Sequence, residues 1–160
     1  TAFLSVDDLA EFTALTRGVG NQQNANANVI NMYFVNSQYA DPGEVVYGRA
    51  WPGANGIVIS DPTFAFAGGV GRLDTLAHEI GHNLGLPHAG GALRLMADGN
   101  VRSIPGALGD IFPNGARMDQ LIAGEITTAQ ASAFSIAVPT PGSLAMLGLS
   151  GLIAVRRRRG

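Results

Sequence analysis

All three histidines of this chain fall within one eleven-residue segment, HEIGHNLGLPH, at residues 78–88. His78 and His82 are four residues apart, so on a helix both imidazoles project from the same face and can bind one metal ion. Glu79 lies about 100° around such a helix, near enough to reach a water molecule on that metal. The segment therefore predicts two metal ligands and a general base on one helix.

The third histidine, His88, can join them only if the helix ends between residues 82 and 88. Gly85 is placed to end it in a left-handed conformation, and Pro87 prevents the helix from resuming. Three histidines placed at random would show this spacing on the order of once in several thousand arrangements. We therefore interpret the triad as a metal site rather than as incidental histidines on a surface helix.

These residues also resemble a known clan. His78, Glu79, His82, Gly85 and His88 match the pattern HExxHxxGxxH of the metzincin metallopeptidases. Met96 lies eight residues after the last histidine, where the Met-turn of that clan falls. The resemblance extends over about residues 5–136. It implies an α/β zincin-like fold with a mixed twisted sheet, an active-site helix, and a small C-terminal subdomain with the Met-turn and a closing helix.

The chemistry expected of such a site is peptide hydrolysis. Three neutral imidazoles leave one position on Zn²⁺ for water, and Glu79 can take the proton of this zinc-bound water as it attacks a carbonyl polarised by the metal. By resemblance, Met96 forms an apolar floor beneath the histidines. The segment GRAWPG resembles the edge strand that lines the metzincin cleft, and Ala50 and Trp51 are the expected peptide-binding residues, although an inert edge strand is equally compatible.

Two features depart from the usual subfamily markers. His88 is followed by Ala89, and Asp98 stands two residues after Met96, where some subfamilies have a zinc-binding tyrosine. The sequence therefore assigns no subfamily. Asp41, Glu44 and Asp61 could contribute to a structural calcium site, but they lack EF-hand spacing, so solvated turn carboxylates are the favoured interpretation.

The elements that must position this site follow from hydrophobic patterning. We expect an amphipathic helix over residues 5–17, capped by Ser5 with Asp8, and strands over residues 29–36, 45–51 and 56–60. A helix over residues 73–83 carries the motif. Residues 85–113 are expected to be irregular, and a last helix is expected over residues 127–134, capped by Thr127. Because the metzincin fold begins with a strand, and little chain precedes Ser5, we expect an N-terminally incomplete domain.

Composition excludes several other classes of protein. The chain has 160 residues, 46% of them hydrophobic, and no cysteine, which indicates one packed domain without disulfides or thiolate metal sites. Four of the ten arginines are at 156–159, and residues 1–155 carry six arginines against twelve acidic residues, a net charge of −6. The negative charge of residues 1–155 would repel the phosphates of a nucleic acid, so no nucleic-acid partner is expected.

The C-terminal tail suggests a membrane. Residues 142–155 form an uncharged stretch followed at once by the four arginines, which is typical of a stop-transfer segment. The order of a Pro-Thr-Pro motif, an apolar stretch and basic residues resembles the bacterial PEP-CTERM sorting tail, with Thr140 where that family has glutamate. The resemblance implies a bacterial sorting or processing enzyme as partner, with export and transient anchoring in the inner membrane before delivery to the cell surface or the medium.

The sequence thus divides into a catalytic domain (1–136), a Pro-rich linker (137–142) and a membrane or sorting segment with an arginine cluster (143–160), which contacts the membrane through residues 143–155. The leading hypothesis is a zinc-dependent metalloendopeptidase acting on peptides or proteins. Two alternatives stay open: a surface-anchored structural or adhesive protein with a vestigial zinc site, and a metallohydrolase acting on another amide.

Overall fold

The computed structural model describes residues 5–17, 23, 24, 26, 28–65, 72–99, 101–103, 107–110 and 120–136. Three strands form the central sheet in the order β2 (Met32–Val35), β5 (Ile57–Ser60), β4 (Gly48–Ala50). β2 runs parallel to β5, with Met32 opposite Ile57, whereas β4 runs antiparallel, with Ala50 opposite Ile57. The mixed sheet expected from the sequence is therefore confirmed, and β4 is at its edge among the described strands.

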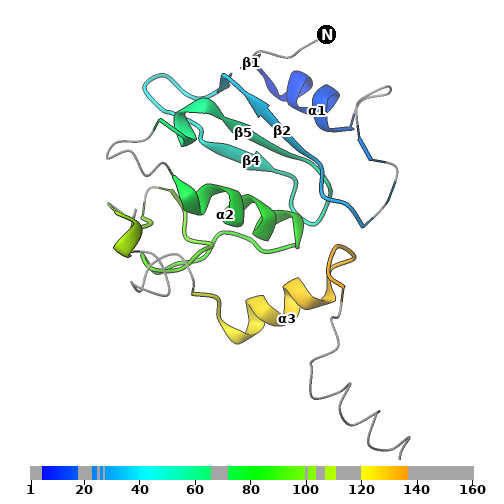
Figure 1. The fold of residues 1–160 in the computed structure, drawn as a ribbon, viewed down its shortest axis with the longest axis vertical. Coiled ribbons are helices and arrows are strands. Elements are labelled where there is room, and N and C mark those ends of the chain that lie inside the picture. The colour runs from blue at the N-terminus through cyan, green and yellow to red at the C-terminus, as the bar shows by residue number, and fades with distance from the viewer. Residues whose placement is uncertain are drawn as a thin grey trace, which may run out of the picture.

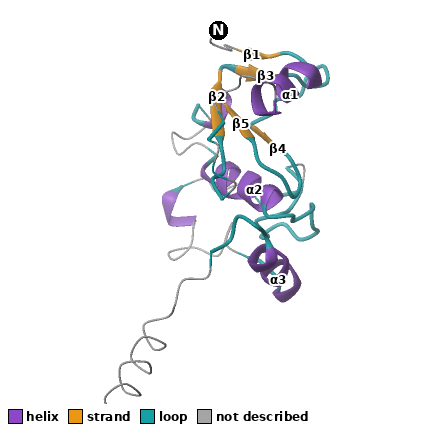
Figure 2. Cartoon of the chain, turned by 90° about the vertical axis from the view of Figure 1, so that its right-hand side faces the viewer, coloured by secondary structure: helices purple, strands orange, loops and turns teal. Residues whose placement is uncertain are grey.

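Two helices pack against this sheet on opposite sides (Figures 1 and 2). Helix α1 (Leu9–Arg17) contacts β5 on one face, and helix α2 (Leu73–Asn83) contacts β4 and β5 on the other. Side chains alternate between the two faces of a strand, so a strand covered by a helix on each face buries all of its residues. This is the case for β5, whose four residues are all buried. Helix α3 (Ala123–Ala131) lies beyond α2, on the side away from the sheet (Figure 1).

The core under α1 is apolar. Phe12 of α1 packs with Val6, Val35 and Val58, and all four side chains are buried. Trp51 covers the edge of this cluster, with its ring centroid 5.0 Å from that of Phe12. The cluster holds α1 on the sheet face opposite α2. It therefore stabilises the sheet against which α2 packs.

The N-terminal segment corrects one prediction. Ser5 does not cap a helix: Ser5–Val6 form strand β1, which pairs in parallel with β3 (Ser37–Gln38) in a separate two-stranded sheet. The cap lies three residues later, where Asp8 Oδ1 accepts the Glu11 N–H at 2.8 Å and Glu11 Oε2 accepts the Asp7 N–H at 2.7 Å. A strand does precede the first helix, and the capping signal was assigned to the wrong one of two similar spacings.

The last helix also begins earlier than predicted. α3 starts at Ala123, and Thr127 lies inside it, with its hydroxyl donating to the Ala123 carbonyl. Glu125 is the capping residue, because its Oε2 accepts the Ile122 N–H at 2.9 Å. By contrast, α2 has the bounds predicted from the sequence. The described part of the chain also contains two 3₁₀ turns that the sequence did not predict, η1 (Asp61–Thr63) and η2 (Leu108–Asp110).

Nothing in the described part of the chain forms a helix long and apolar enough to cross a membrane. The tail at residues 137–160, for which a linker and a membrane or sorting segment were predicted, lies outside the described residues.

Two phenylalanines on the sheet and α1 give a matched test of this core. Phe12 is 1% exposed and Phe34 of β2 is 60% exposed. We expect Phe12→Ala to lower the free energy of unfolding by about 3–5 kcal/mol, because it leaves a cavity. Phe34→Ala should cost less than about 1 kcal/mol. Urea unfolding followed by circular dichroism measures both, and equal losses would contradict the packing described.

Candidate metal centre

Helix α2 ends in a way that turns the third histidine back toward the first two. Gly85 has φ +92°, the left-handed conformation predicted from the sequence. Its N–H donates to the His82 carbonyl at 2.8 Å, and the Leu86 N–H donates to the Gly81 carbonyl at 3.0 Å. These two bonds form a Schellman motif, in which the last carbonyls of the helix are satisfied as the chain reverses. The chain that follows leads to His88.

The three imidazoles converge through their Nε2 atoms. His88 Nε2 lies 3.2 Å from His78 Nε2 and 3.1 Å from His82 Nε2. Nitrogens that bind one tetrahedral zinc at 2.0–2.1 Å would be about 3.3 Å apart. The observed separations therefore fit a zinc ion with little adjustment. No other group of three or more His, Cys, Asp or Glu ligand atoms gathers in this way among the described residues.

The Nδ1 atoms of His78 and His82, on the other side of each ring, have hydrogen-bond partners that set the tautomer of the imidazole. His78 Nδ1 lies 2.8 Å from the Leu95 carbonyl, and His82 Nδ1 lies 2.8 Å from the Leu86 carbonyl. Because a carbonyl only accepts, each Nδ1 carries the proton and each Nε2 presents its lone pair to the metal position.

Burial keeps the two helical ligands neutral. It lowers the pKa of His78 to about 4, although the hydrogen bond to Leu95 acts in the opposite direction. The pKa of His82 is lowered for the same main reason. A metal binds only unprotonated imidazole, so these shifts favour metal binding at neutral pH.

Glu79 is buried beside the triad, with 6% of its surface exposed. Burial raises the pKa of its carboxyl group to about 7, and the positive charges of Arg102 and Arg49 oppose this shift. The side chain lies against Gly48 of β4, where a Cβ would come within 2.7 Å of Glu79 Cγ. Gly48 is thus part of the site, and the signal that could have found it is a glycine inside an edge strand, which often marks a close approach.

Met96 is fully buried under α2. Its Sδ and Cε atoms occupy the space where a side chain on Gly81 would lie. The segment before it supplies the Leu95 carbonyl that binds His78, and the Met96 carbonyl accepts the Ala89 N–H at 2.8 Å. Met96 therefore fills the space between α2 and the chain that follows His88.

A cavity of about 850 Å³ lies between β4 and α2 and contains the triad. Ala50 lines it, as do Gly48, Glu79 and Arg102. The sequence did not single out Arg102, whose guanidinium lies 3.0 Å from Asp74 of α2 and 3.4 Å from the Leu95 carbonyl. No local pattern signals this role, because the residues that it joins are far apart in the chain.

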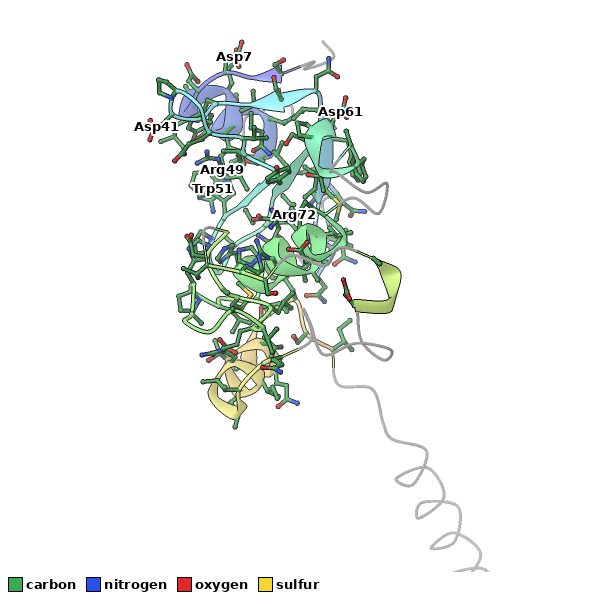
Figure 3. All side chains as sticks on the ribbon, turned by 90° about the vertical axis from the view of Figure 1, so that its left-hand side faces the viewer. Asp7, Asp41, Arg49, Trp51, Asp61 and Arg72 are labelled. Carbon is green, nitrogen blue, oxygen red and sulfur yellow. The ribbon has the colours of Figure 1, made fainter. Side chains whose placement is uncertain are left out.

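Trp51 is not among the residues that line this cavity, and its expected role in peptide binding stays a prediction. Its indole Nε1–H donates to the Thr16 hydroxyl at 2.8 Å, and the Arg17 guanidinium lies 3.9 Å from the ring centroid. Side chains alternate along a strand, so the step from Ala50 to Trp51 turns the indole to the α1 face. Figure 3 shows Trp51 beside Arg49, whose guanidinium stacks over Tyr39.

Asp41, Glu44 and Asp61, the acidic residues that could contribute to a calcium site, do not lie close together. Asp41 and Asp61 lie at opposite edges of the molecule in Figure 3. With Glu44, they form no three-ligand cluster.

A mixed α/β domain with three histidines around one position and a buried glutamate beside the first is the architecture of a metallopeptidase. The model of the metallo-peptidase family M12B, reprolysin-like, matches residues 5–89, and the chain belongs to this family. The match includes His78, His82 and His88. Neither the curated proteins nor the solved structures include one that matches the chain.

The contact between α2 and Met96 can be tested with two glycines. Gly81→Ala would force its Cβ onto the Met96 sulfur, whereas Gly124→Ala, in α3, meets nothing within 4 Å. We expect Gly81→Ala to lower the free energy of unfolding by about 1–3 kcal/mol and to weaken zinc binding, since Met96 lies beside the histidine helix. Gly124→Ala should leave both unchanged or raise stability slightly. Thermal unfolding and zinc titration measure the pair, and a Gly81→Ala protein that matches Gly124→Ala in both would refute the contact.

Proposed function

We propose that the chain is a zinc-dependent endopeptidase of metzincin type. The observation that carries the proposal is the convergence of three Nε2 atoms next to a buried carboxyl group, with the His88 atom 3.2 Å from that of His78 and 3.1 Å from that of His82. Membership of a metallopeptidase family supports the same conclusion. Among the described residues no fourth His, Cys, Asp or Glu joins the three imidazoles, which leaves the open coordination position that distinguishes catalytic from structural zinc sites.

When bound, zinc supplies Lewis acidity that polarises a peptide carbonyl and acidifies water. Glu79 is the group that moves protons. Its pKa of about 7 suits a base that takes a proton from the attacking water and then, as an acid, returns it to the leaving amine. Gly48 leaves the room that the Glu79 side chain occupies, because a Cβ at this position would come within 2.8 Å of Glu79 Oε1.

The substrate would bind along β4. This strand is paired with β5 on one side only among the described strands, and the cavity that contains the triad adjoins it. An extended peptide can add to such an edge, with main-chain hydrogen bonds giving affinity and side-chain contacts giving preference. Ala50 lies in this cavity and is the residue of β4 that we propose contacts the peptide. Met96 would provide the apolar base beneath the histidines.

The tail extends the proposal to location. An uncharged stretch followed by four arginines supports transient anchoring of residues 143–155 in a bacterial inner membrane, with a sorting enzyme as partner. This part of the proposal rests on the sequence pattern alone.

The central test removes the base while keeping the ligands. Glu79→Gln should lower kcat/KM on an unfolded protein substrate by about 10²–10⁴-fold, which is the usual contribution of a general base. Zinc content, measured by elemental analysis, should stay at that of the wild type. Turnover that survives Glu79→Gln, or that a zinc chelator leaves unchanged, would overturn the proposal. Stoichiometric zinc without turnover by the wild type would favour the vestigial-site alternative.

A second test concerns the placement of the carboxyl group. Gly48→Ala brings a Cβ within 2.8 Å of Glu79 Oε1, so we expect kcat to fall at least tenfold while zinc affinity is retained. Gly109→Ala, in η2, meets nothing within 4 Å and serves as the control. Equal kcat values for the two variants would show that Gly48 does not position Glu79.

A further inference from the structure

The three histidines differ in how their outer ring nitrogens are held. His78 and His82 lie on α2, and main-chain carbonyls bind their Nδ1 atoms. His88 lies outside the helix, and its Nδ1 faces a side chain, with Asp98 Oδ2 at 3.3 Å. Within the triad, only the Nδ1 atom of His88 faces a side chain, so a substitution can remove this partner but not the main-chain partners of His78 and His82.

His88 also has the least support from packing. Its side chain is 50% exposed, whereas His78 is buried. An exposed imidazole can rotate about its side-chain bonds, and a metal site loses affinity when one ligand has to be ordered on binding. A partner that fixes the ring before the metal arrives therefore has the largest effect at this ligand.

The fold brings Asp98 to this position. Ala89 and Ala97 form an isolated β-bridge, and the Ala89 N–H donates to the Met96 carbonyl. His88 and Asp98 are each next to one residue of that bridge, so the two side chains meet at the edge of the cavity, which both of them line. Asp98 occupies the position two residues after Met96.

We propose that Asp98 is a positioning residue for His88. Its carboxylate accepts the Nδ1–H of His88, which selects the tautomer with a free Nε2, points that atom at the metal position, and makes the imidazole a stronger donor. Asp98 touches neither substrate nor metal in this role and acts through His88. The inference rests on the proposed zinc site.

The test is the zinc affinity of the full chain, measured by competition with a chromophoric chelator. We expect Asp98→Ala to weaken zinc binding about 10–100-fold, the range found when such outer partners are removed. Asp61→Ala removes an exposed carboxylate elsewhere on the surface and should change the affinity less than about threefold. Asp98→Glu restores a carboxylate and should recover part of the loss.

A spectroscopic readout separates positioning from a general structural effect. In the zinc-loaded wild type, ¹⁵N-histidine NMR should show a protonated Nδ1 and a metal-bound Nε2 at His88, with the Nδ1–H protected from exchange. In Asp98→Ala this protection should be lost while the signals of His78 and His82 persist. Circular dichroism of the metal-free proteins should be the same, because Asp98 is 45% exposed.

The outcomes distinguish the two proposals. A wild type that binds zinc, together with an Asp98→Ala variant of equal affinity and unchanged His88 signals, overturns the role of Asp98 and leaves the peptidase proposal intact. A wild type that binds no zinc overturns both. If Asp98→Ala fails to fold, Asp98→Leu removes the acceptor and keeps a side chain of similar shape, and unchanged zinc affinity in that variant also overturns the role of Asp98.

Discussion

The site depends on how closely helix α2 is packed on two of its sides. Toward the sheet, Gly48 lets the backbone of β4 approach Glu79, and toward the chain that follows the triad, Gly81 leaves the space that Met96 fills. A Cβ at Gly48 would displace the Glu79 side chain, whereas a Cβ at Gly81 would meet the Met96 sulfur and push α2 away from the chain that follows the triad. The directions of His78 and His82 are fixed relative to the helix, so their places in the cavity depend on the contact between Gly81 and Met96.

Burial by these contacts also sets the electrostatics. It favours neutral imidazoles and raises the pKa of Glu79, whereas Arg102 opposes the rise at Glu79. Arg102 is itself nearly buried and is held by Asp74, which also pairs with Arg72 at 3.3 Å. The same guanidinium lies near the Leu95 carbonyl, the partner of His78. One buried cation thus links Asp74 at the start of α2, the electrostatics of Glu79 and the carbonyl that binds His78.

Sequence reasoning succeeded where the chemistry is local. The spacing of the histidines, the bounds of α2 and the left-handed Gly85 all depend on residues within about three helical turns, so the sequence contains the signal directly. It failed at Ser5, where two capping spacings overlapped, and it could not predict that the Trp51 indole contacts α1, because that depends on the sheet register. The contacts of Gly48, Asp98 and Arg102 were not recognised, because each is with a residue that only the folded chain brings near.

The donor set of the triad has a consequence for metal identity. All three ligand atoms are imidazole nitrogens, borderline donors that bind copper and nickel as well as zinc. Affinity for such a set follows the general order of the divalent metals, in which copper exceeds zinc. The donors alone therefore do not select zinc over copper, so the metal that such a triad would hold also depends on which ion is available where the chain folds.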